Sequence, residues 1–65
     1  MSSTIVETNS EQEAEQLADL LEERTEMNAL PVSTSSPEGT VHGVAVAAEN
    51  GEVAEWALLH LRSNQ

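Results

Sequence analysis

Two histidines, His42 and His60, are the side chains of this sequence best suited to chemistry near neutral pH. Imidazole is also a common metal ligand, but a metal site needs at least a third donor. The sequence has no cysteine, and neither histidine belongs to a His-x-x-x-His or Glu-x-x-His spacing. We therefore expect both histidines to be packed, hydrogen-bonded residues, and we expect no metal and no cofactor.

Candidate nucleophiles are concentrated in one serine-rich stretch, which holds Ser33, Ser35 and Ser36. Pro37 and Gly39 follow at once, so turn formation explains the serine content of this stretch. The chain has no lysine and no Gly-x-Ser-x-Gly motif, and its 3 glycines are too scattered to form a phosphate-binding loop. A chain of 65 residues also leaves little room for a buried pocket. The sequence predicts that the protein is not an enzyme.

Acidic residues dominate the charge of the chain. It has 12 Asp and Glu residues and 2 Arg residues, which gives a net charge of −10. Nucleic-acid binding is not expected, because phosphates require a cationic surface that two arginines do not supply. Three interpretations of the charge stay open. The first is adaptation to molar salt, since the composition resembles that of cytoplasmic proteins of haloarchaea. The second is that the chain is an acidic partner of a basic protein, such as an antitoxin or a nucleic-acid mimic. The third is an ordinary acidic surface.

An acidic ridge is the densest cluster of charge in the sequence. It is formed by residues at a spacing of four, Glu11, Glu15, Asp19 and Glu23. Like charges at this spacing destabilise a helix at low salt by roughly 0.2–0.5 kcal/mol per pair. Such a ridge is either a solvated helix face or a docking surface for a basic partner. Arg24 lies away from the ridge by helical angle, and we expect it along the edge of the core.

The first half of the chain predicts a strand and then a helix. Residues 4–8 are β-prone. Ser10 and Glu13 form a capping box, which places the start of a helix near Glu11. Apolar residues then recur at helical spacing, and the helix is expected to fade over 25–27 with Asn28 as its C-terminal residue.

The second half predicts a hairpin and a second helix. Residues 29–34 form a strand, and Pro31 places it at a sheet edge because proline has no amide hydrogen. A turn over 35–39 leads to a strand over 40–48 that is apolar on both sides and should therefore be central. The spacing of Val53, Trp56 and the apolar residues after them predicts a helix over 51–62.

These elements combine into one small α+β domain spanning residues 1–65. The order is β-α-β-β-α, and the hairpin inserts its second strand between the other two. The sequence therefore predicts a three-stranded antiparallel sheet in the order 1-3-2 with both helices on one side. This arrangement is a truncated ferredoxin-like layer.

The chain also resembles a family of small signal-transducing proteins of the domain of unknown function 2007 type. The matching pieces are the helix segment 13–23, Leu30-Pro31-Val32, and Val44-Ala45-Val46 followed by Glu52-Val53-Ala54. The family usually has Gly-Ile before the proline, where this chain has Ala29-Leu30. The resemblance implies the fold and no particular activity.

The uncovered side of the sheet is the predicted interface. If Val44 and Val46 face the helices, the opposite side of the central strand shows a flat strip of small apolar residues, Val41, Gly43, Ala45 and Ala47. Such patches mark association surfaces. Trp56 is either a core anchor or part of the interface. We expect a non-catalytic, cytoplasmic protein that forms a homo-oligomer or serves as an adaptor or regulatory module, with no membrane and no nucleic-acid partner.

Overall fold

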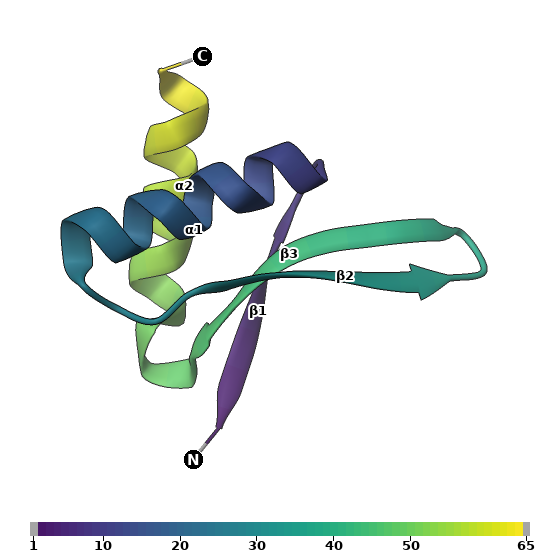
Figure 1. Ribbon diagram of the computed structural model, residues 1–65, viewed down its shortest axis with the longest axis horizontal. Coiled ribbons are helices and arrows are strands. Elements are labelled where there is room, and N and C mark those ends of the chain that lie inside the picture. Colours follow the sequence, from purple (N-terminus) through teal and green to yellow (C-terminus); the bar gives the residue numbers. More distant parts are fainter. Residues whose placement is uncertain (1, 65) are drawn as a thin grey trace.

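The computed structural model describes residues 2–64, which form three strands and two helices (Figure 1). In chain order the elements are β1 (Ser3–Thr8), α1 (Glu11–Thr25), β2 (Leu30–Ser36), β3 (Gly39–Ala47), the short 3-10 helix η1 (Ala48–Asn50) and α2 (Gly51–Ser63). The strands form one sheet in the order β1-β3-β2, and β3 pairs antiparallel with both neighbours. The predicted β-α-β-β-α arrangement and its strand order are confirmed.

The capping box sets the start of α1 where the sequence predicts it. The Ser10 hydroxyl accepts a hydrogen bond from the Glu13 amide at 3.1 Å, and the Glu13 carboxylate accepts one from the Asn9 amide at 2.9 Å. These bonds satisfy backbone donors that have no partner inside the helix.

α1 stops at Thr25, at the start of the range predicted for its end, but the residue that terminates it is Glu26, so the prediction of Asn28 for that role is wrong. Glu26 adopts the left-handed conformation with φ 56°, which reverses the chain two residues earlier than expected. The early reversal lets the following loop bury Ala29 in the core.

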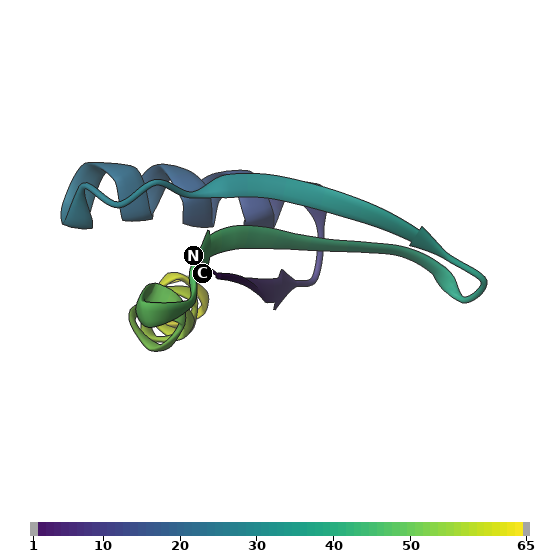
Figure 2. The same ribbon diagram turned by 90° about the horizontal axis from the view of Figure 1, so that it is seen from below.

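The hairpin is longer than predicted, and its turn is shorter. β2 extends to Ser36 and pairs there with Gly39, so only Pro37 and Glu38 lie between the strands. The Ser36 hydroxyl donates to the Gly39 carbonyl at 2.7 Å, and Gly39 has a φ of 129° that favours glycine. The distal part of the hairpin, residues 33–41, is exposed and extends well beyond both helices (Figures 1 and 2).

Both helices contribute to one core on one face of the sheet. Val6, Val44 and Val46 point into this core from the strands. In Figure 2, α1 lies level with β2 and α2 lies level with β1, which agrees with the contacts of α1 to β2 and β3 and of α2 to β1. The remaining buried residues come mostly from the helices: Ala14, Leu17, Ala18, Leu21, Ala29, Ala54 and Leu58. Within residues 2–64, no helix lies on the other face of the sheet (Figure 2).

In residues 2–64, neither helix has the length and apolar character that crossing a membrane would require.

Candidate functional site

The open face of the sheet, opposite the helices, is built from the strand residues that alternate with the core valines. The strand register places them in rows across the sheet. Ile5, Ala45 and Leu30 form one row. The neighbouring rows consist of Glu7, Gly43 and Val32, of Val41 and Thr34, and of Ser3 and Ala47. We call these residues the open face.

Large apolar side chains stand exposed on this face. Ile5 is 57% exposed, Leu30 67% and Val41 39%. Ile5 and Leu30 lie on the two outer strands, and the small Ala45 lies between them on the central strand. The face therefore has two apolar ridges on either side of a shallow strip of small residues.

Close approach of β1 to β3 explains why glycine occupies position 43. A Cβ atom on Gly43 would lie 2.7 Å from Ile5 Cγ2 and 2.8 Å from the Val6 carbonyl oxygen. The missing side chain lets Ile5 lean over β3 toward the middle of the open face. Glycine at a strand interior often marks such a close contact.

The register places all four predicted strand residues on this face: Val41, Gly43, Ala45 and Ala47. Gly43 itself is buried beneath Ile5. Sequence reasoning did not include Ile5 and Leu30, the two most exposed apolar residues here. Both residues could have been identified from the sequence. Leu30 lies on the same side of its strand as Val32, two residues away, and Ile5 lies on the opposite side of its strand from its neighbour Val6.

Trp56 lies on the outer side of α2 and is 69% exposed, so the core alternative for this residue is wrong. The apolar residues of α2 divide between core and surface. Ala54 and Leu58 are buried, Ala57 and Leu61 pack against the core, and Val53 and Trp56 are exposed. The small Ala54 is fully buried between α2 and the rest of the core. Trp56 therefore belongs to a second apolar surface with Val53 and Leu59, separate from the open face.

An ion pair joins the start of α1 to the end of α2. Arg62 Nη2 donates to Glu13 Oε1 at 2.9 Å, and Arg62 Nε lies 3.4 Å from Glu13 Oε2. These bonds, together with the bond from the Asn9 amide, hold the pKa of Glu13 below its ordinary value of 4.5. This pair was missed from the sequence. Arg24, which we expected at the core edge, is exposed.

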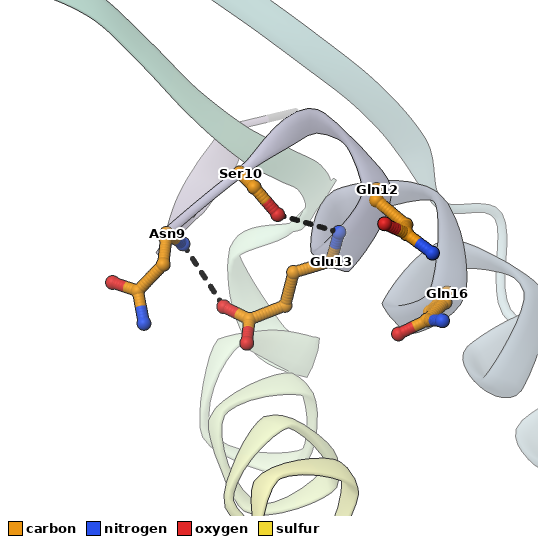
Figure 3. Close-up of a pocket in the computed structure, with 5 residues that line it drawn as sticks. All are labelled: Asn9, Ser10, Gln12, Glu13 and Gln16. Carbon is orange, nitrogen blue, oxygen red and sulfur yellow. Dashed lines mark hydrogen bonds between the residues drawn. The ribbon is translucent and has the colours of Figure 1, made fainter. Parts of the chain in front are cut away.

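A polar hollow of about 470 Å³ opens beside this ion pair, lined by Asn9, Ser10, Gln12, Glu13 and Gln16 (Figure 3). A helix N-terminus attracts anions. Here the Glu13 carboxylate already accepts a hydrogen bond from the Asn9 amide, and the Ser10 hydroxyl accepts one from the Glu13 amide. The hollow therefore presents a carboxylate of the chain itself, so we assign it a structural role.

The two histidines lie on different elements and bind different partners. His42 Nδ1 is 2.8 Å from the Ser33 hydroxyl across the β2–β3 pair. His60 Nε2 is 3.2 Å from Asn64 Nδ2, one helical turn away. Within residues 2–64 neither histidine joins a group of three possible metal ligands.

The acidic ridge is exposed along α1, and it lies on the helix side of the sheet. All four of its residues are exposed: Glu11, Glu15, Asp19 and Glu23. In the described part of the chain the one ion pair involves Glu13, which is not a member of the ridge. The ridge is therefore a solvated surface of unpaired negative charge, set apart from the open face.

Comparison with protein-family models, with curated proteins and with solved structures finds no match for this chain. The resemblance to the domain of unknown function 2007 type stays a prediction, and the open face remains the best candidate site.

Proposed function

We propose that this chain is a non-catalytic association module of a salt-rich cytoplasm, and that it forms a homodimer through the open face of its sheet. The observation that carries the proposal is the row of Ile5, Ala45 and Leu30, which is apolar across all three strands and has no helix over it. An exposed apolar patch of this kind marks an interaction surface.

The charge distribution supports a second copy as the occupant. Glu7 is the one charged side chain of the open face. Two chains of net charge −10 repel one another, so they can approach closely only through a surface that carries little of this charge. The acidic ridge is on the far side of the sheet from such a partner, where water and counterions solvate it.

The shape of the open face also suits a copy of itself. Two sheets pack face to face about 10 Å apart, with the side chains of each filling the hollows of the other. Across a two-fold axis, Leu30 and Ile5 of one copy can fill the strip at Ala45 of the other. Strand spacing and rise give a face of roughly 300 Å² per copy, which is below the ~800 Å² per partner of a stable complex. We therefore expect a weak, concentration-dependent dimer.

Salt should strengthen this dimer. Molar salt reduces the screening length to about 3 Å, which removes most of the repulsion between the two acidic chains. The proposed salt adaptation and the proposed dimer therefore support each other.

Sedimentation equilibrium at several chain concentrations, in low and in molar KCl, tests the proposal. The chain should dimerise in molar KCl, and Leu30→Ser should weaken this dimer by about tenfold. The matched control is Leu59→Ser, because Leu59 is 62% exposed but lies on α2. A chain that stays monomeric at millimolar concentration in molar KCl would overturn the homodimer. Loss of the dimer in the Leu59 variant alone would assign the interface to α2.

A further inference from the structure

The outer edge of β2 is an exposed strand edge with little protection against pairing. β2 is a terminal strand of the sheet, and its register with β3 is one-to-one from Leu30 to Ser36, without a bulge. Its sequence, Leu-Pro-Val-Ser-Thr-Ser-Ser, contains no charged residue. Natural proteins blunt such edges with lysine, proline, bulges or a covering element. Here only Pro31, near the start of the strand, serves this purpose.

Pro31 also identifies which backbone groups point outward. Alternate residues of a strand direct their N–H and C=O groups to the same edge. Proline is tolerated in a paired strand where its missing N–H would have faced away from the partner strand. Ser33 and Ser35 share the parity of Pro31, so their N–H and C=O groups face outward and are free to pair. Both residues are exposed.

An acidic flank of α1 lies beside the start of this edge, and the edge continues past the helix along the distal hairpin (Figures 1 and 2). Glu13 points toward α2, where it binds Arg62. At about 100° per residue, Glu11, Glu15 and Glu22 fall on the opposite flank of α1 from Glu13. Because α1 lies over β2 and α2 lies over β1 (Figure 2), this flank is turned toward the side of the molecule where β2 ends the sheet.

These charges decide which occupant fits the edge. A second copy paired through β2 would bring the same acidic flank of two α1 helices together over the junction. An extended segment carrying basic side chains would instead be attracted to it. We propose that the outer edge of β2 binds a lysine- or arginine-containing extended segment of a partner protein, which adds a fourth strand to the sheet.

The two faces of the sheet specify the pattern of this segment. Side chains of an added strand point alternately to the two faces. Those on the helix side beside the start of β2 meet the acidic flank of α1, and those on the other side continue the open face beside Leu30 and Val32. The segment therefore alternates basic and apolar residues. Main-chain pairing supplies affinity, and the alternating side chains supply specificity.

The test uses a short fluorescent peptide in which lysine and valine alternate, with binding followed by anisotropy at moderate salt. A second peptide of identical composition carries its lysines and valines in two separate blocks. We expect the alternating peptide to bind about tenfold more tightly than the block peptide. Equal affinities would overturn the proposal, because the attraction would then be only that of a cationic chain for an acidic protein.

A matched pair of variants locates the binding. Ser35→Pro removes an outward N–H, and Ser35→Ala keeps it. The proline variant should lose about tenfold in affinity while the alanine variant binds as the parent does. Hydrogen exchange gives a readout that does not depend on how the proline variant folds, because bound peptide should slow exchange of the Ser33 and Ser35 amides in the parent chain. Unchanged exchange at both amides would refute strand addition.

The dimer and the edge are tested separately. Leu59→Ser, which leaves β2 unchanged, serves as a matched surface control for peptide binding. If the chain proves monomeric and still binds the alternating peptide, the dimer fails and the edge proposal stands. If the chain dimerises and does not distinguish the two peptides, the dimer proposal stands and the edge proposal fails.

Discussion

Replacing Gly43 by alanine tests the close approach of β1 to β3 that shapes the open face. The new Cβ would lie 2.7 Å from Ile5 Cγ2 and 2.8 Å from the Val6 carbonyl oxygen, both too short for real contacts. Overpacking of this kind costs about 1–3 kcal/mol. In an open strand the same change would stabilise the chain by roughly 0.5–1 kcal/mol, because glycine loses more conformational freedom on folding. The change in the free energy of unfolding therefore has opposite signs in the two cases.

A second substitution separates the two contacts. Ile5→Ala removes the side-chain contact but leaves the Val6 carbonyl in place. Gly43→Ala should therefore cost about 0.5–1 kcal/mol less in the Ile5→Ala background than in the parent, without becoming favourable. The four chains are compared by urea unfolding in molar KCl, followed by circular dichroism. Stabilisation by Gly43→Ala in the parent, or equal costs in both backgrounds, would refute the close approach of the strands.

Three further predictions concern the ends of α1 and the charge. Glu26→Gly should raise the free energy of unfolding by about 1 kcal/mol, since φ 56° is unfavourable for glutamate; Glu26→Gln, which keeps that strain, should change it much less, and equal effects would attribute the gain to charge alone. The pKa of Glu13 is lowered in the folded chain, so its stabilising contribution is complete above pH 4.5 and is lost as the pH falls through the folded value. The stability difference between the parent and Glu13→Gln should therefore shrink below pH 4.5, and a constant difference would contradict the ion pair to Arg62. Far-ultraviolet circular dichroism should show structure increasing from low to molar KCl, and full folding in a few millimolar salt would argue against salt adaptation.

The strand order could be predicted because two independent signals agreed on it. Pro31 excluded β2 from the centre of the sheet, and the apolar residues on both sides of β3 favoured that strand for the centre. The start of α1 was equally accessible, because the capping box is a local hydrogen-bond pattern between Ser10 and Glu13. Where a signal was local and unambiguous, the prediction agreed with the structure.

The rotation of α2 could not be obtained in this way. Val53, Trp56 and Ala57 fit the helical period on one side, but Ala54 and Leu58 form a second apolar stripe beside them. Which stripe turns inward depends on the space left between α1 and the sheet, and there the small Ala54 fits where an indole would not. The ion pair between Glu13 and Arg62 could not be predicted for a related reason. The two residues are 49 positions apart, and their contact depends on how the two helices cross.

The start of the hairpin turn was misplaced because serine suits both turns and exposed strand edges. Ser35 and Ser36 indicate a loop by composition. In the fold they continue β2, paired with Thr40 and Gly39. Composition alone does not separate these alternatives.

The position of β3 in the chain has a consequence for how the protein is made. β1 emerges before the other described elements during synthesis, yet the strand that it pairs with ends at Ala47. Until that strand has left the ribosome, β1 and the apolar side of α1 have no sheet to join. The hairpin, whose partners are close in sequence, can pair early, but alone it is only marginally stable in water. Assembly of the core therefore waits for β3, and until then the net charge of −10 opposes association of the unfolded chain.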